Sequence, residues 1–296
     1  MKTGTSLPYI LIVPSVAFVT AILVYPIVRA VGLSFFEVNL LTYLRRSEFV
    51  GWANYVRLFG SARFWKSLQI TFLFTIGSVA GTYVLGLITA LLMNLRFRGR
   101  GIARGALLLP WVTPEVVLVL IWIWIYDPQF GVLNFFFRKL HLISANLYPL
   151  GNPSLALGSL LVTMVWRQYP LAMLMLLAGL QSIPGEQYEA ASIDGAHLFH
   201  RFRFITLPNL KYVSSILVLL LTVWGFVEFV VIYLMTQGGP AHSTETLIIR
   251  TYLSAFKYYE LGEACAQGVV ILAVSMGFAL VYFRIFLPGM KESVAK

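Results

Sequence analysis

Three ionisable residues lie inside long apolar stretches of this 296-residue sequence, namely Glu115, Arg167 and Glu228. A charge placed at the centre of a membrane costs on the order of 3 kcal/mol on insertion scales, so such residues face a partner or an aqueous cavity. Carboxylates and a guanidinium together offer acceptors and donors to a polar solute, or steps in a proton relay. The alternative is an ion pair between helices with a purely structural role.

Helical spacing extends these charges into two side-chain faces. Residues at i, i+3, i+4 and i+7 lie on one side of a helix. The first such face consists of Met164, Arg167, Gln168 and Leu171. The second consists of Leu221, Trp224, Gly225 and Glu228. Their charged and amide groups could hydrogen-bond hydroxyls, and Trp224 could provide a flat apolar platform for a ring.

A second cluster lies in a polar gap between two apolar stretches and reads Glu-Ala-Ala-Ser-Ile-Asp-Gly-Ala. Its small side chains would let another protein approach a helix closely, while its carboxylates would serve as polar anchors. The residues concerned are Glu189, Ala190, Ala191, Asp194, Gly195 and Ala196. A surface loop without a partner is the plain alternative.

The elements that position both clusters are expected to be membrane-spanning helices. The chain is 59% hydrophobic and 11% charged, its mean hydropathy is +0.81, and a soluble domain is nearer to a quarter charged. A hydrocarbon core of about 30 Å needs roughly 20 helical residues, and backbone groups in lipid must bond internally. We therefore predict one all-α transmembrane domain over 1–296, with helices near 9–31, 68–95, 105–126, 156–180, 211–236 and 264–288.

Charge density predicts the orientation. The segment 96–104 carries four arginines and no acid, which is typical of a cytoplasmic loop. Basic residues also occur in the longer loops on the other side, so the density rather than the total decides. Both termini are then expected to be cytoplasmic, and the inner segments are 1–7, 96–104, 181–210 and 289–296.

Several classes of protein are disfavoured. The net charge is +10, but the basic residues are scattered over helix ends and form no stripe for nucleic acid. Contact with anionic lipid headgroups is the preferred interpretation.

No G-x-x-x-x-G-K-[ST] phosphate loop is present, so we expect ATP hydrolysis in a separate subunit. His197 and His200 lack a carboxylate or cysteine cluster, and we expect no metal. Cys265 is the single cysteine, so no disulfide within the chain is possible.

The first apolar run, Tyr9 to Val31, differs from a secretory signal peptide. It is longer than the apolar region of a signal peptide, and no small-x-small cleavage site closes it. We therefore expect a retained helix.

Three motifs resemble those of inner-membrane subunits of binding-protein-dependent ABC importers of the maltose or sugar type. The stretch from Glu189 to Ala196, continued by Phe202, Ile205, Leu207 and Pro208, resembles their EAA loop. The stretch from Phe49 to Tyr55 resembles their F-x-G-x-x-N-Y segment. The stretch from Thr236 to Pro240 resembles the T-x-G-G-P loop of one of the two permease subunits in sugar importers.

This resemblance implies a type I importer permease fold with six helices, and an EAA helix that couples to a groove of an ATPase subunit. It also implies a second, different permease, two ATP-binding subunits, a solute-binding protein and a bacterial cytoplasmic membrane. The two faces counted above match positions that line the sugar site in the maltose importer subunit. There the residues are mostly aromatic or uncharged polar, from which Arg167 and Glu228 depart. No cofactor is expected beyond the ATP held by the partners.

The sequence leaves two alternatives open. Importers of the same class carry other solutes, such as glycerol phosphates, although an anionic substrate would favour a more cationic cavity than Arg167 beside two glutamates. A self-sufficient secondary transporter or channel could use the same charges as a proton relay, but it would not need an EAA loop.

Overall fold

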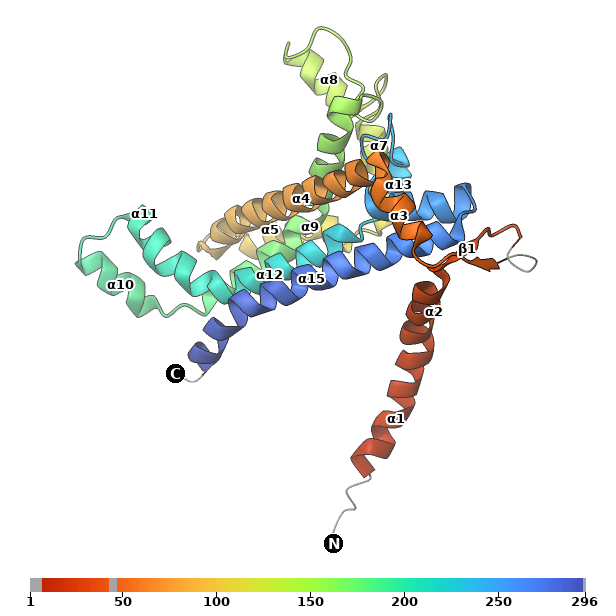
Figure 1. Ribbon diagram of the computed structural model, residues 1–296. Coiled ribbons are helices and arrows are strands. Elements are labelled where there is room, and N and C mark those ends of the chain that lie inside the picture. Colours follow the sequence, from red (N-terminus) through yellow and green to blue (C-terminus); the bar gives the residue numbers. More distant parts are fainter. Residues whose placement is uncertain (1–6, 43–46, 295–296) are drawn as a thin grey trace. The chain divides into compact units, whose positions relative to one another are not determined.

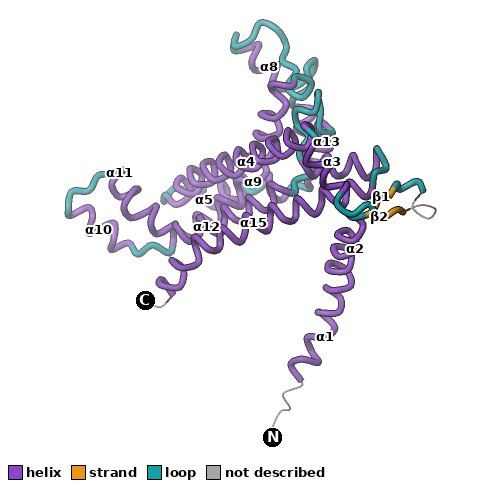
Figure 2. Tube along the Cα trace, in the orientation of Figure 1, coloured by secondary structure: helices purple, strands orange, loops and turns teal. Residues whose placement is uncertain are grey.

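The computed structural model describes residues 7–42 and 47–294, and most of them are helical (Figures 1 and 2). Its contacts divide the chain into two compact units, Met1–Lys66 with Arg250–Val274, and Ser67–Ile249 with Ser275–Lys296. The α-helices in chain order are α1 (Leu7–Val19), α2 (Tyr25–Leu33), α3 (Ala53–Gly60), α4 (Ala62–Asn94), α5 (Arg100–Leu107), α6 (Leu109–Val112), α7 (Glu115–Ile125), α8 (Val132–Lys139), α9 (Pro153–Gln181), α10 (Gly185–Ile193), α11 (Leu198–Arg201), α12 (Leu207–Phe226), α13 (Val230–Thr236), α14 (Leu247–Tyr252) and α15 (Leu261–Val294). The π-helical segments are η1 (Thr20–Val24), η2 (Phe202–Thr206) and η3 (Leu253–Lys257).

In the first unit, buried Asn54 ties α3 to the turn that follows α2. Its side-chain amide donates to the carbonyls of Ser34 at 2.8 Å and Phe36 at 2.9 Å. Phe36 begins β1 (Phe36–Val38), which pairs antiparallel with β2 (Ser47–Phe49). A buried amide needs such partners, which explains the asparagine of the F-x-G-x-x-N-Y segment.

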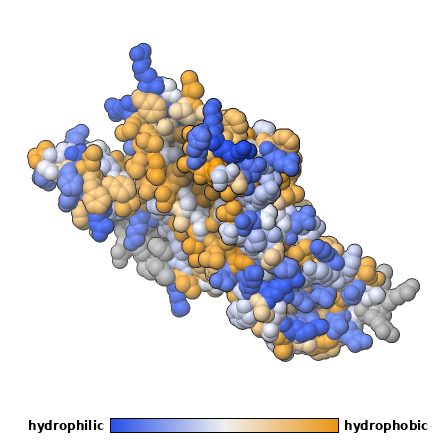
Figure 3. All heavy atoms as spheres, turned by 90° about the horizontal axis from the view of Figure 1, so that it is seen from above, coloured by the Kyte–Doolittle hydropathy of each residue, from blue (hydrophilic) through white to orange (hydrophobic). Residues whose placement is uncertain are grey.

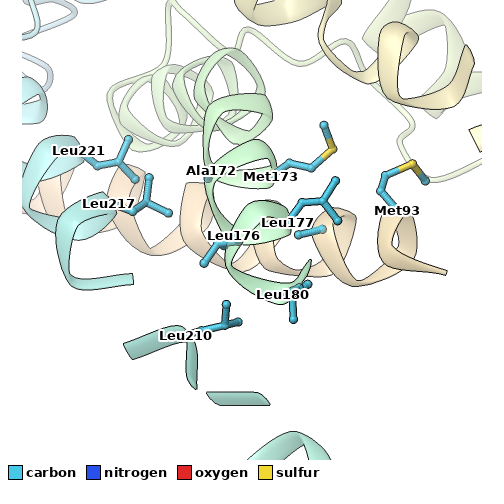
Figure 4. Close-up of a cluster of buried hydrophobic side chains, with 10 residues drawn as sticks. Met93, Ala172, Met173, Leu176, Leu177, Leu180, Leu210, Leu217 and Leu221 are labelled. Atoms are coloured by element: carbon cyan, nitrogen blue, oxygen red, sulfur yellow. The ribbon is translucent and has the colours of Figure 1, made fainter. Parts of the chain in front are cut away.

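In the second unit, α4, α9 and α12 share a hydrophobic core (Figure 4). Small residues let these helices approach, as is common in membrane bundles. A side chain at Gly86 would collide with the Cβ of Ala172, and one at Gly179 would meet Leu210 at 2.8 Å. The core residues are Ala90, Met93, Ala172, Met173, Leu176, Leu177, Leu180, Leu210, Leu217 and Leu221.

The two ends of this unit differ. The segment with α10 and α11 extends from the end of α9, whereas α7, α8 and α13 lie near the opposite end of α9 (Figure 1). Large apolar side chains such as Ile76 and Val84 remain exposed along α4, and Figure 3 shows hydrophobic patches interspersed with hydrophilic residues. Such a surface suits lipid or another membrane subunit.

Five of the six predicted spans coincide with long apolar helices among the described residues, at Leu11–Leu33, Ala62–Asn94, Pro153–Gln181, Leu198–Phe226 and Leu261–Arg284. The expected helical membrane fold is thereby confirmed, with β1 and β2 as a short addition. The span expected at 105–126 is instead divided into α5, α6 and α7, of which α7 is the longest with 11 residues. Pro110 and Pro114 lie at these divisions. Proline interrupts a helix because it lacks the backbone N–H that a continuous helix requires. The span expected at 211–236 also breaks, between Phe226 and Val230.

Candidate functional site

Arg167 on α9 lies between two carboxylates from different elements. Its Nη1 atom is 2.5 Å from Oε1 of Glu115 and 3.1 Å from Oε2 of Glu228. The side chain of Glu228 is only 9% exposed, whereas those of Arg167 and Glu115 are 24% and 28% exposed. The Oε1 atom of Glu115 is buried. The result is a cluster of one guanidinium and two carboxyl groups.

Local backbone breaks position the two carboxylates. Glu115 is the first residue of α7, and Pro114 before it is the N-cap residue, with a non-helical ψ of 132°. Glu228 lies in the break between α12 and α13, where its Oε1 accepts a hydrogen bond from the backbone N–H of Val231 at 3.1 Å. One oxygen of Glu228 thus satisfies the start of α13 while the other faces Arg167.

The other residues of the two predicted faces differ in accessibility. Gln168 is buried, and Leu221 belongs to the core of Figure 4. Gly225 packs against α4, since a Cβ there would lie 2.9 Å from the methyl carbon of Thr75. Trp224 is 39% exposed. Leu171 is half-buried on α9.

The ion pair brings the two faces together at Arg167 and Glu228. Glu115 belongs to neither of the two predicted faces. Its position as an ionisable residue within an apolar stretch was the available signal, and the contact with Arg167 appears only in the tertiary structure.

The predicted coupling segment forms an exposed helix with a glycine-dependent end. Glu189, Ala190 and Ala191 lie on α10, which ends at Ile193 and has Asp194 as its C-cap residue. Gly195 follows with φ +76°, in the left-handed region.

Two hydrogen bonds close the end of α10. The N–H of Ala196 donates to the carbonyl of Ala191 at 2.8 Å, and that of Gly195 donates to Ser192 at 3.2 Å. These are the two bonds of a Schellman motif. The glycine of the EAA loop is therefore required by the backbone at this turn.

Apolar side chains beside this turn face outward. Ile193 is 87% exposed and Leu198 is 81% exposed, and Phe199 and Phe204 are also exposed. Isolated apolar residues on a surface need no explanation, but four exposed ones within residues 193–204 form a candidate contact surface. His197 and His200 lie 2.7 Å apart through ring nitrogens; within the described residues no group of three or more potential ligands could hold a metal ion.

These features define a helical membrane protein with a charged cluster between its helices and a short exposed helix, α10. Residues 82–292 match the family described as "Binding-protein-dependent transport system inner membrane component". The chain belongs to this family. It is a permease component of an ABC importer, as the motifs in the sequence predicted.

The sequences of curated relatives align with this chain along nearly its whole length. A probable ABC transporter permease of Brucella suis is 36% identical over 95% of this chain and 96% of its own. The trehalose/maltose permease MalF of Thermococcus litoralis is 35% identical over 94% of this chain and 93% of its own. The sulfoquinovosyl glycerol permease SmoG of Agrobacterium fabrum is 36% identical over 94% and 90%.

A solved structure shows the same fold. A chain of a bacterial ABC transporter that imports the acidic polysaccharide alginate superposes with a TM-score of 0.80, at 20% identity, over 94% of each chain. A complex of the alginate transporter with its pentasaccharide-bound periplasmic protein gives 0.81, over 95% of this chain and 93% of that chain. The type I importer permease fold is thereby confirmed.

Proposed function

We propose that this permease carries a sugar or a similar polyhydroxylated solute, delivered to its outer face by a solute-binding protein. The observation that carries the proposal is the 35% identity to a trehalose/maltose permease along 94% of the chain. The sugar-related name of the Agrobacterium relative supports the same substrate class.

The substrate-binding residues in this proposal are Arg167, Gln168, Leu171, Leu221, Trp224, Gly225 and Glu228. Hydroxyl groups need both donors and acceptors, which the guanidinium and the carboxylates supply. Glu115, whose Oε1 is paired with Arg167, adds a second carboxyl group to this cluster. The single guanidinium is already paired with two carboxyl groups, so the cluster offers no free cation to a phosphate ester.

Two ATP-binding subunits would dock on the coupling segment and hydrolyse ATP. The exposed α10 helix and its apolar neighbours support this assignment. Closure of the ATPases would draw the coupling helices together and switch the cavity from inward-facing to outward-facing. ATP would be bound by these partners alone, and this chain would need no cofactor of its own.

A second, different permease would complete the pore. The first span supports this, because none of its apolar window from Leu11 to Leu33 is buried within the described part of this chain. Lipid and a sister subunit would cover it. The assembly would lie in a bacterial cytoplasmic membrane with both termini of this chain inside.

Reconstituted transport tests the proposal. The chain would be co-expressed with its sister permease and ATPases, placed in proteoliposomes, and supplied with binding protein and labelled maltose, trehalose or glycerol 3-phosphate. We expect uptake of a sugar that requires both ATP and the binding protein. Uptake of glycerol phosphate but no sugar would contradict the substrate class. Uptake by this chain alone without ATP would contradict the whole mechanism and favour a secondary transporter.

A further inference from the structure

A groove of about 610 Å³ lies in the second unit, where α4 and α9 end and the coupling segment begins. It is lined by Ile88, Leu91, Leu92, Asn94, Leu95, Leu180, Tyr188, Leu198, Arg201, Phe202 and Thr206. The apolar lining comes mainly from the last turns of α4. The polar side includes Tyr188, whose hydroxyl lies 3.0 Å from that of Thr206. The groove therefore has an apolar wall and a polar edge.

The charge at this groove has one sign. Among the described residues, Arg201 is the only charged member of the lining, and no carboxylate lines it. Nε of Arg201 donates to the carbonyl of Ala196 at 2.8 Å, which fixes the position of the guanidinium. A single fixed cation beside an apolar groove suits an anion that carries an apolar body.

More arginines are anchored to the backbone at the rim. Nη1 of Arg100 is 3.5 Å from the carbonyl oxygen of Leu95, a residue that lines the groove. Nη2 of Arg104 donates to the carbonyl of Met93 at 3.0 Å, and Nε of Arg104 is buried without a hydrogen-bond partner in the described chain. The arginine-rich segment 96–104 thus lies against the end of α4 that forms the groove.

We propose that this groove binds an anionic phospholipid, with an acyl chain along the apolar wall and the phosphate near Arg201 and the 96–104 arginines. Basic pockets at the ends of membrane helices bind such headgroups, and each nearby arginine contributes to the attraction. The lipid would hold the coupling segment against the ends of α4 and α9. This site is separate from the solute path, and its occupancy does not depend on which solute is carried.

Matched variants test both parts of the groove. Leu92 and Leu73 are on the same helix and are each 51% exposed, but only Leu92 lines the groove. Leu92→Trp should fill the groove, and Leu73→Trp is its control. Arg201→Gln removes the fixed cation, and Arg138→Gln on the exposed end of α8 is its control.

The assembled importer would be purified and titrated with phosphatidylglycerol or phosphatidylcholine, with bound lipid counted by native mass spectrometry. We expect tighter binding of phosphatidylglycerol, weakened about fivefold by Arg201→Gln with phosphatidylcholine unchanged. Leu92→Trp should reduce the binding of both lipids, while both controls behave like the unaltered protein.

Equal binding of the two lipids, or full lipid binding by Leu92→Trp, would overturn the proposal. Cross-linking of Leu92→Cys to a partner subunit in the assembled importer would also overturn it, because the groove would then be a protein interface. The lipid titration is independent of solute uptake, so failure of the sugar assignment would not affect it.

Discussion

Arg167 and Glu228 are 61 residues apart in sequence, yet Nη1 of the first lies 3.1 Å from Oε2 of the second. The contact joins α9 to the break that separates α12 from α13. Glu228 also accepts from the N–H of Val231, so the ion pair and the start of α13 share one carboxylate. A change at either residue therefore acts on the charge cluster and on the helix break together.

Removal of Arg167 alone should damage the protein. Arg167→Met would leave Glu115 and Glu228 as unpaired carboxylates, and breaking a buried pair in this way costs about 3–5 kcal/mol. We expect reduced amounts of assembled importer, measured by size-exclusion chromatography after co-expression. Lys257→Met, at the exposed end of η3, is the control and should assemble normally. Normal assembly of Arg167→Met would show that the cluster is not important for folding.

A companion variant, in which the whole cluster is neutral, separates structure from transport. Glu115→Gln, Arg167→Met and Glu228→Gln together leave no charge, and glutamine at 228 keeps an acceptor for the N–H of Val231. This triple variant should assemble, but its sugar uptake should fall about tenfold or more, since a hydrogen bond to a charged group contributes about 1.5–3 kcal/mol. Uptake and specificity equal to the unaltered importer would assign the cluster a structural role only.

Trp224 should contribute an apolar platform to the solute path. Trp224→Ala should lower sugar uptake or change the preferred sugar without loss of assembly, because the side chain is 39% exposed in this chain. Trp124→Ala on α7 is a suitable control, since Trp124 is exposed and belongs to neither predicted face. Equal uptake kinetics for both alanine variants would remove Trp224 from the site.

The end of α10 provides a test of coupling. Gly195 has φ +76°, and a Cβ at this position would meet no described heavy atom within 4 Å beyond its chain neighbours. Alanine there would therefore be strained by the backbone alone, at a cost of about 1–2 kcal/mol, whereas asparagine tolerates the left-handed region better. We expect the amount of solute taken up per ATP hydrolysed to be highest in the unaltered protein. It should then decrease from Gly195→Asn through Gly195→Ala to Gly195→Pro. Full uptake by the proline variant would show that this turn is not needed for coupling.

Orientation can be tested by thiol labelling in intact cells. Cys265 would first be replaced by alanine to give a background without cysteine. Arg98→Cys in the arginine-rich segment should then resist a membrane-impermeant reagent, and Lys139→Cys at the end of α8 should react with it. Both positions are exposed. The opposite pattern would reverse the orientation.

Glu260 should make the stability of the first unit depend on pH. Burial first, and then the negative charge of Glu263, raise the pKa of Glu260, while Arg57 and Arg250 oppose the shift. Because the folded state holds this proton more tightly, its contribution to stability is complete below the usual pKa of about 4.3 and is lost as pH rises through the raised pKa. Glu260→Gln should lessen the fall in melting temperature between pH 4 and pH 7 that the unaltered protein shows. An identical pH profile for both proteins would contradict this.

The sequence by itself determined the class of fold and the turn that ends the predicted coupling helix. Apolar length predicted the spans, because a helix in lipid is a local solution that needs only its own backbone partners. The glycine of the EAA loop is local in the same way, since the Schellman bonds join Ser192, Ala191 and their near neighbours. Only the tertiary structure decided that Glu115 joins Arg167, and that Leu221 on a predicted solute face lies in the helix core. Periodicity gives the side of a helix on which a residue lies, but the element facing that side depends on how distant helices pack and where prolines and breaks divide them.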